Sequence, residues 1–175
     1  MSLPRRVTVV EVGPRDGLQS EAVPLSVEDR VAFCDRLTAA GLPVVEVGAF
    51  VSPKWVPQMA GSDEVLRRVS KPEGVRLPVL VPNRTGFDLA RAAGAREIAV
   101  FTAASETFSR RNTNASIDES FSRFAEFVTE ARREGIRDFG ACMAPFVAFQ
   151  ILQGIETLPL RMERHVENTR RIVAF

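Results

Sequence analysis

Arg15 and Asp16 are the residues whose types and positions point most directly to chemistry. They follow the apolar stretch 7–10, which is typical of a β-strand, and Gly13 and Gly17 bracket them in a turn. The loops that follow the strands of a parallel α/β protein form its reactive face. There Asp16 is a candidate ligand for a hard divalent cation, and Arg15 is a candidate stabiliser of developing negative charge. Taken alone, the motif also fits a surface ion pair, because such pairs are common and contribute little.

Two longer strings resemble a known enzyme family. Residues 11–19 read Glu-Val-Gly-Pro-Arg-Asp-Gly-Leu-Gln, and residues 50–59 read Phe-Val-Ser-Pro-Lys-Trp-Val-Pro-Gln-Met. Together they resemble the hydroxymethylglutaryl-CoA (HMG-CoA) lyase family, whereas the related aldol- and Claisen-type synthases share only the Arg-Asp-Gly turn. The resemblance runs from about Val7 to Cys142, with further similar stretches at 78–83, 102–108 and 112–121.

The resemblance implies the fold and the reaction. It implies an α/β protein of the (β/α)8 TIM-barrel type, apparently incomplete, with about five βα units in residues 1–142. Residues 143–175 are unmatched, and we expect them to be helical and to pack on the same domain. The implied activity is a metal-dependent carbon–carbon lyase that cleaves 3-hydroxy-3-methylglutaryl-CoA to acetyl-CoA and acetoacetate. Whether it serves leucine degradation or ketone-body formation stays open.

The resemblance also assigns roles to single residues. It makes Arg15 the transition-state electrophile, Asp16 a metal ligand, Glu46 the carboxylate that positions Arg15, and Gln19 a residue bordering the substrate. Physically this is coherent, because cleavage of a 3-hydroxyacyl thioester leaves an enolate that a fixed guanidinium and a cation can stabilise. Glu46 is also compatible with a salt bridge that only holds the fold.

The stretch 105–114 is the second candidate contact region. It is expected to be a loop after the fourth strand, and it carries Ser105, Arg110 and Arg111 beside Phe108. The resemblance makes these residues candidate contacts for the phosphates and adenine of coenzyme A, although a solvated basic loop would have the same composition. Lys54 and Trp55 either shape the pocket wall or, in the case of Trp55, anchor the packing.

The metal site is the weak point of the resemblance. Family members bind Mg²⁺ or Mn²⁺ through two further histidines of a His-x-His motif and an Asn, and none of these positions occurs in this sequence. Its one histidine, His165, is expected to be an ordinary helix-side residue. Two alternatives therefore stand beside the lyase: a related lyase or aldolase for another 3-hydroxyacyl-CoA, since Ala49 replaces a common Ser, or a non-catalytic half-barrel.

Local patterns predict the elements that position these residues. Near-continuous apolar stretches at 44–47, 79–81 and 98–101 indicate buried parallel strands covered by helices, and five strands alternating with four helices can be counted up to Cys142. Pattern alone does not separate an open doubly wound sheet from a barrel, although no Gly-x-Gly-x-x-Gly motif supports a dinucleotide fold.

Helix ends are predicted by capping residues. Ser26 and Ser116 are expected to cap two helices, with Val27, Val31, Cys34 and Leu37 buried on the first, and Phe121, Phe124 and Val128 on the second. Glycines at 41, 74, 94 and 135 are expected to end helices just before strands.

Composition sets the remaining limits. The 175 residues carry a net charge of +1, which gives no reason to expect nucleic-acid or membrane binding. The two cysteines, Cys34 and Cys142, lack partner spacing and are expected to be reduced, packed thiols. We therefore expect a cytoplasmic protein, and the resemblance implies an acyl-CoA substrate. The isolated chain is expected to self-associate as a homo-oligomer through its open sheet edges, or to pair with a complementary half.

Overall fold

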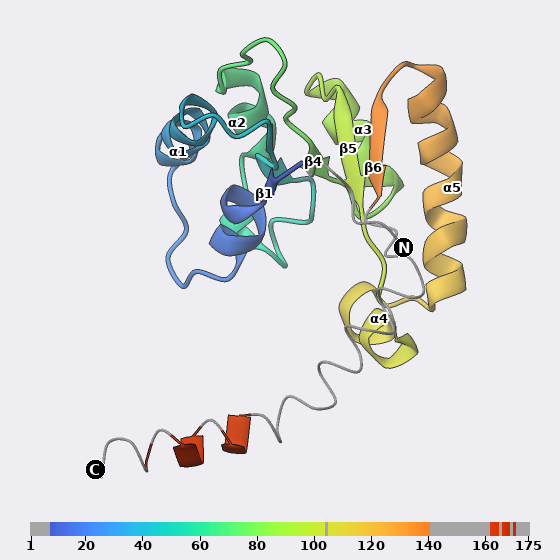
Figure 1. Ribbon diagram of the computed structural model, residues 1–175. Helices are drawn as coiled ribbons and strands as arrows, with labels where there is room; N and C mark the ends of the chain where they lie inside the picture. The colour runs from blue at the N-terminus through green and yellow to red at the C-terminus, as the bar shows by residue number, and fades with distance from the viewer. Residues whose placement is uncertain (1–7, 104, 141–161, 165, 169, 171–175) are drawn as a thin grey trace, which may run out of the picture. The chain divides into compact units, whose positions relative to one another are not determined.

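The computed structural model describes residues 8–103, 105–140, 162–164, 166–168 and 170. The chain divides into two units, 1–141 and 142–175, and strands alternate with helices along the first (Figure 1). The elements of that unit, in order, are β1 (Val10–Glu11), η1 (Gly13–Gly17), α1 (Val27–Ala39), β2 (Val44–Val45), β3 (Gly48–Ala49), η2 (Pro57–Met59), α2 (Ser62–Arg68), β4 (Val79–Leu80), α3 (Arg84–Ala92), β5 (Glu97–Val100), α4 (Glu106–Thr113), α5 (Ile117–Arg133) and β6 (Arg137–Gly140).

All strand pairs are parallel, as predicted. β1 pairs with β2, and β3, β4, β5 and β6 pair in that order. β2 and β3 belong to one extended stretch, 44–49, which hydrogen-bonds to β1 at its start and to β4 at its end. The Glu46 amide donates to the Glu11 carbonyl (2.8 Å), and the Phe50 amide donates to the Leu80 carbonyl (2.8 Å). The six described strands form a two-stranded and a four-stranded parallel sheet, and the stretch 44–49 connects the two, which fits an incomplete barrel.

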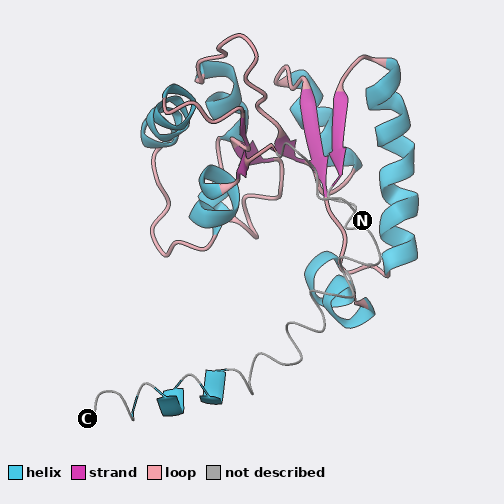
Figure 2. Ribbon diagram, in the orientation of Figure 1, coloured by secondary structure: helices cyan, strands magenta, loops and turns pink. Residues whose placement is uncertain are grey.

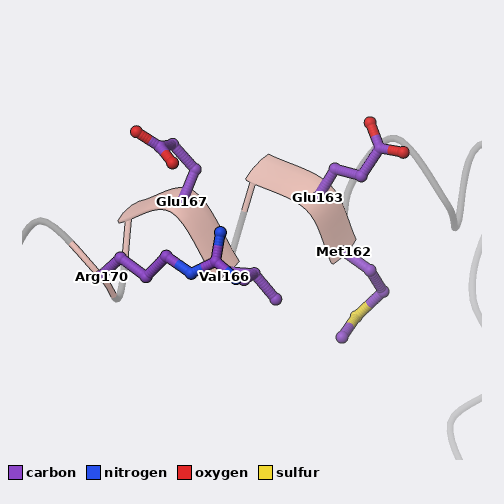
Figure 3. Close-up of a pocket in the computed structure, with 5 residues that line it drawn as sticks. All are labelled: Met162, Glu163, Val166, Glu167 and Arg170. Carbon is purple, nitrogen blue, oxygen red and sulfur yellow. The ribbon is translucent and has the colours of Figure 1, made fainter.

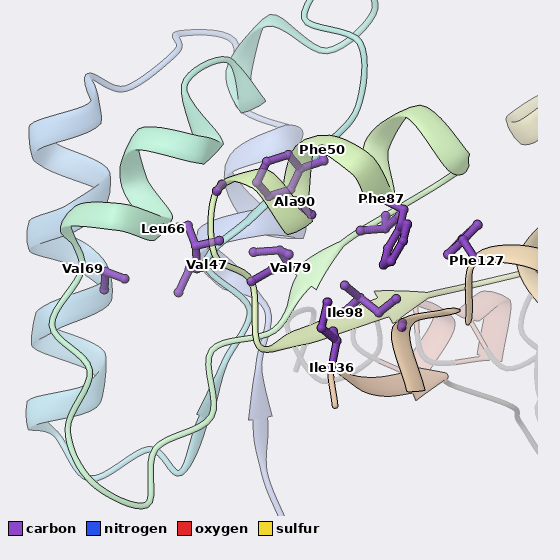
Figure 4. Close-up of a cluster of buried hydrophobic side chains, with 14 of the residues drawn as sticks. Val47, Phe50, Leu66, Val69, Val79, Phe87, Ala90, Ile98, Phe127 and Ile136 are labelled. Carbon is purple, nitrogen blue, oxygen red and sulfur yellow. The ribbon is translucent and has the colours of Figure 1, made fainter. Parts of the chain in front are cut away.

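The main core lies between the strands and the covering helices (Figure 4). Val47 and Val79 from the strands, with Ile98, pack toward Phe87 of α3 and Phe127 of α5. The Phe87 and Phe127 rings stack with centroids 5.4 Å apart. Burying each such side chain contributes about 1.5–3 kcal/mol, so this layer holds the helices on the sheet.

A second, smaller cluster contains the residues that alternate with the first set along the strands. Its buried members are Ala49, Met59, Leu80 and Ala99. Val79 and Ile98 belong to the helix-facing cluster, whereas their neighbours Leu80 and Ala99 belong to this one, because successive strand residues point to opposite faces. Residues on both faces of these strands are therefore buried, whereas helices were expected to cover only one face.

The predicted helix caps are confirmed with one exception. Ser26 and Ser116 cap α1 and α5, and Ser116 forms a full capping box with Glu119. After α1, α3 and α5 the chain turns through a left-handed glycine, at 41, 94 and 135. The expectation for Gly74 is wrong, because α2 ends at Arg68 and Gly74 instead lies, with a positive φ, inside a turn in which the Val75 amide donates to the Pro72 carbonyl.

The buried stripes of two helices are shifted from their predicted positions. On α5 the buried residues are Ser120, Phe124, Phe127 and Ala131, whereas Phe121 is 50% exposed. On α1 Cys34 is buried as predicted, but Val27, Val31 and Leu37 are only partly buried, and the other buried positions are Arg30 and Thr38. Docking against neighbouring elements rotates the buried face relative to the most apolar stripe of the sequence.

The structure also decides three smaller expectations, about the start of β1, the packing of Trp55 and the state of Cys34. β1 begins at Val10, later than predicted, because the ladder forms only opposite Val44. Trp55 is 83% exposed and therefore does not anchor the packing. Burial raises the pKa of the Cys34 thiol to about 12, which agrees with a packed, unreactive cysteine, whereas Cys142 lies outside the described residues.

In the second unit, residues 162–164, 166–168 and 170 are helical. The expected packing of 143–175 on the preceding domain concerns residues that lie mostly outside the described ones. His165 also lies outside them. Across the described ranges, no helix is both long and apolar enough to span a membrane.

Candidate active site

The Arg-Asp-Gly turn is a short π-helical turn, η1, at the carboxyl end of β1. The amides of Arg15 and Asp16 both donate to the Val12 carbonyl, at 3.0 and 2.7 Å. The Gly13 amide donates to Glu11 Oε1 at 2.6 Å. Neither glycine of the turn has a positive φ, so a left-handed backbone does not explain the glycine at either position. At Gly13 the reason is space, because a Cβ there would lie 2.7 Å from Glu11 Oε1.

Arg15 is held by a forked contact with Glu46. Arg15 Nε donates to Glu46 Oε2 at 3.0 Å, and a terminal nitrogen of the same guanidinium lies 2.9 Å from the same oxygen. The other terminal nitrogen donates to Asp16 Oδ1 at 2.6 Å. The side chains of Arg15 and Glu46 are 17% and 4% exposed, whereas that of Asp16 is 64% exposed. The three residues therefore form a cluster that is buried at one end and open to solvent at the other.

Glu46 carries the electrostatic cost of this arrangement. Burial raises the pKa of its carboxyl group, Arg15 opposes that rise by charge and hydrogen bonding, and the nearby Asp16 carboxylate adds to it. Its second oxygen, Oε1, is buried without a hydrogen-bond partner among the described residues. The charge on this buried carboxylate is therefore stabilised mainly by Arg15. The same contact also holds the Arg15 guanidinium in place.

Asp16 offers one carboxylate to a metal ion and no complete site. Its exposed position at the reactive edge suits a hard cation, but Mg²⁺ needs near-octahedral oxygen coordination. Within the ranges that the structure describes, no group of three or more His, Cys, Asp or Glu residues could hold a metal. The described residues therefore do not fit a resident Mg²⁺ or Mn²⁺ by themselves.

Gln19 lies shortly after η1, and its side-chain oxygen is also buried, with no hydrogen-bond partner in the part of the chain that the structure describes. The neighbouring segment is tied to the loop that follows β3, because Gln58 Nε2 donates to the Glu21 carbonyl at 2.9 Å. This contact joins the second string that resembles the lyase family, residues 50–59, to the segment just after the first, residues 11–19. A buried acceptor next to the Arg15 turn is compatible with the predicted substrate contact, which stays a prediction.

The stretch 105–114 is a helix and not the predicted loop. Ser105 caps α4 by accepting from the Phe108 amide at 3.3 Å, and the helix ends at Asn114 in a left-handed conformation. Arg110 and Arg111 are exposed in its last turn, and Arg110 lies 3.7 Å from Glu106. α4 lies at the edge of the sheet toward which the arrows of β5 and β6 point (Figure 2). No hydrogen bond or ion pair among the described residues joins these side chains to Arg15, Asp16, Glu46 or Gln19.

Sequence reasoning missed residues that hold this site together. Glu11 fixes the turn through Gly13, and the only signal was an acidic residue at the end of a strand. Arg30 lies in the otherwise apolar stripe of α1 and bonds to Ser62, which contacts β3. The sequence indicated this only by placing Arg30 three residues after Val27 and four before Cys34, on the face of the helix expected to be buried.

A surface hollow lies in the second unit. Met162, Glu163, Val166, Glu167 and Arg170 line it, and all come from one short helical stretch (Figure 3). Successive side chains of a single helix leave such an open groove without enclosing a ligand. None of the predicted site residues lines it.

The geometry defines an α/β protein of the parallel-barrel class, with an arginine and two carboxylates at the carboxyl end of its first two strand segments. The HMGL-like family model matches residues 6–164, so the chain belongs to this family. The match runs past Cys142, where the motifs quoted above end. This assignment confirms the resemblance seen in the sequence strings.

Individual relatives are HMG-CoA lyases. The hydroxymethylglutaryl-CoA lyase of Pseudomonas mevalonii is 60% identical over 131 residues, 75% of this chain and 44% of that enzyme. The structure of the enzyme from Pseudomonas aeruginosa has a TM-score of 0.75 at 52% identity, covering 80% of this chain and 47% of that one. A lyase from Acinetobacter baumannii, solved with coenzyme A and 3-methylmalate, has a TM-score of 0.72 at 30% identity, covering 76% of this chain and 43% of that one. The chain thus spans less than half the length of these relatives.

Proposed function

We propose that this chain carries the Arg15, Asp16 and Glu46 part of a lyase site that cleaves 3-hydroxy-3-methylglutaryl-CoA to acetyl-CoA and acetoacetate. The observation that supports this most is the forked contact of Arg15 with the buried Glu46 at the carboxyl edge of the sheet. Membership in the HMGL-like family and 60% identity to the P. mevalonii lyase support the choice of reaction.

The proposed chemistry uses Arg15 directly. When the 3-hydroxyl group loses its proton, the C2–C3 bond breaks, acetoacetate forms at C3, and the electron pair passes through C2 to the thioester oxygen. The resulting acetyl-CoA enolate is then protonated at C2. A guanidinium that Glu46 holds in place stabilises the negative charge on that oxygen without reorganising during the reaction. Glu46 is accordingly a positioning residue, and Arg15 is the catalytic residue.

The remaining roles are proposals of the same kind. Gln19 borders the substrate, and Ser105, Arg110 and Arg111 on α4 contact coenzyme A, with the exposed arginines suited to phosphate groups. Family members are generally dependent on a divalent metal, and Asp16 is the ligand that this chain would contribute for Mg²⁺ or Mn²⁺. We propose residues 1–142 as the first part of the barrel domain and 143–175 as a separate segment that packs on it. The cytoplasmic location and the homo-oligomer stay predictions.

The test uses a chimera, because the chain covers 44% of the P. mevalonii enzyme. Residues 1–142 replace the corresponding part of that enzyme, and acetoacetate release from HMG-CoA is measured with Mn²⁺ or Mg²⁺ for the chimera and for the 175-residue chain. We expect cleavage by the chimera and none by the chain alone. A chimera that folds and binds coenzyme A but cleaves a different 3-hydroxyacyl-CoA would support the related-lyase alternative. A folded chimera inactive on every such thioester would contradict the proposal.

A further inference from the structure

Arg30 is a buried cation without an acidic partner among the described residues. It projects from the middle of α1, is 1% exposed and ranks among the largest fully buried side chains of the protein. Buried charges are normally paired, because removing them from water is costly. Burial accordingly lowers the pKa of this guanidinium from its ordinary value. An apolar side chain at this position would avoid that cost, so the contacts of Arg30 need another explanation than stability.

Those contacts all go to one short turn between η2 and the start of α2. One terminal nitrogen of Arg30 donates to the Ala60 carbonyl at 2.7 Å. The other donates to Ser62 Oγ at 2.9 Å and lies 3.9 Å from Met59 Sδ. The remaining nitrogen, Nε, is buried and has no hydrogen-bond partner within residues 8–103, 105–140 and the described part of 162–170. Both terminal nitrogens of Arg30 therefore bind the turn 59–62, and its guanidinium makes no other hydrogen bond among the described residues.

The same turn is bonded to β3, the strand segment that follows Glu46. Ser62 Oγ donates to the Met59 carbonyl at 2.7 Å and accepts from the Ala49 amide at 3.2 Å. Gly48 leaves the space for this contact, because a Cβ there would lie 2.7 Å from Ser62 Oγ and 3.1 Å from a terminal nitrogen of Arg30. Arg30, Ser62 and the backbone at 48–49 thus form one connected set of contacts.

The loop 51–61 is consequently held from two sides. Arg30 and Ser62 hold its end, and Gln58 holds it to the segment after the Arg15 turn through the Glu21 carbonyl. This loop contains most of the second string shared with the lyase family. The loop 51–61 follows directly after the stretch 44–49, which contains Glu46. The position of the loop therefore affects the position of the Arg15–Glu46 pair.

We propose that Arg30 is a positioning residue: its buried guanidinium fixes the loop 51–61 and the end of the Glu46 strand beside the Arg15 turn. The catalytic meaning of this placement rests on the function proposed above. The placement itself is a property of the 175-residue chain and can be measured without any turnover assay. Failure of the lyase proposal and failure of this one are therefore distinguishable.

The experiment compares native-state amide hydrogen exchange of the whole chain with that of Arg30→Met, which keeps the length and apolar stem of the side chain. We expect the amides of Ala49, Met59 and Ala60 to exchange about tenfold faster or more in the variant, as the loss of two charge-assisted hydrogen bonds predicts. Exchange in α5 should change by much less. Trp55 is the one tryptophan of the chain and lies in the same loop, so its fluorescence anisotropy should fall.

Controls separate positioning from general stability. Arg36→Met removes an exposed arginine from the same helix and should leave exchange at these three amides unchanged. Arg30→Lys should restore part of the protection, because an ammonium group can reach one of the two acceptors. If Arg30→Met does not fold, Ser62→Ala serves as the second variant, and the Met59 and Ala60 amides should exchange faster in it. Equal acceleration in all segments, or none in the loop, would overturn the proposal.

Discussion

The ion pair between Arg15 and Glu46 makes a quantitative prediction about the pH dependence of stability. In Arg15→Met, the Glu46 carboxyl, 4% exposed with one oxygen already unpartnered, loses the cation that opposes its burial. Its pKa, already raised by burial, must rise further, so folding now favours the protonated form. A raised carboxyl pKa means that the penalty is absent at low pH and grows as the pH rises above the value in the unfolded chain.

The size of the penalty follows from that linkage. Keeping the carboxyl group neutral costs 1.36 kcal/mol for each pH unit above the unfolded pKa of about 4.3, which gives about 1 kcal/mol at pH 5 and about 4 kcal/mol at pH 7 as upper limits. The second figure falls within the ~3–5 kcal/mol typical of breaking a buried pair. We therefore expect Arg15→Met to lose progressively more unfolding free energy than the native sequence between pH 5 and pH 8.

Urea unfolding followed by far-UV circular dichroism at pH 5, 6, 7 and 8 measures this difference. Arg67→Met is the matched control, because Arg67 and Asp63 form an exposed pair with side chains 53% and 49% exposed. That variant should lose less than ~1 kcal/mol at every pH. The double variant Arg15→Met, Glu46→Gln should lose the pH dependence. An equal loss at pH 5 and pH 8 in the single variant would refute the claim that Arg15 holds a buried charge on Glu46.

Four further outcomes are expected. In the lyase chimera, Arg15→Lys should reduce kcat on the order of a hundredfold, because an ammonium group cannot reproduce the forked donors; near-normal turnover would remove Arg15 from the mechanism. Asp16→Asn should weaken the metal requirement of the chimera more than its affinity for coenzyme A, measured by metal titration, and an unchanged requirement would show that Asp16 is not a ligand. Iodoacetamide should label Cys34 far more slowly in the folded chain than in urea, since burial raises the thiol pKa to about 12; peptide mass spectrometry measures both rates. The isolated chain should self-associate through its open strand edges, and light scattering during size-exclusion chromatography that shows only a monomer would contradict this.

The sequence predicts those parts of the fold that depend on local rules. Ser26 and Ser116 cap helices because the hydroxyl reaches an amide three residues away, and Gly41 and Gly135 turn the chain because only a glycine adopts that backbone conformation without strain. The Arg15 turn is local in the same way. Its identification needed the family strings, because an arginine next to an aspartate is common on protein surfaces.

The parts that could not be predicted depend on contacts between distant segments. The bond from Arg30 to Ser62 joins residues that are 32 positions apart, and nothing in either neighbourhood indicates the other. The stretch 105–114 has a low helical signal because it is polar, yet it forms α4 once Ser105 caps it and Glu106 accepts from the Ile117 amide at the start of α5. Which face of α5 is buried likewise depends on how that helix docks on α3 and β6.

The contacts of Arg15 and of Arg30 converge on the backbone stretch 44–49. Glu46 accepts a hydrogen bond from Arg15, which follows β1. Gly48 and Ala49 lie against Ser62 of α2, and Gly48 also lies near Arg30 of α1. If stability alone governed these positions, apolar residues would serve as well or better, because replacing buried charges by well-packed apolar groups is often neutral or favourable. Charges gain an advantage when a fixed geometry matters, since each guanidinium specifies the direction and distance of its acceptors. Two arginines whose contacts converge on this one short stretch of backbone are therefore best explained as fixing the position of its carboxyl end.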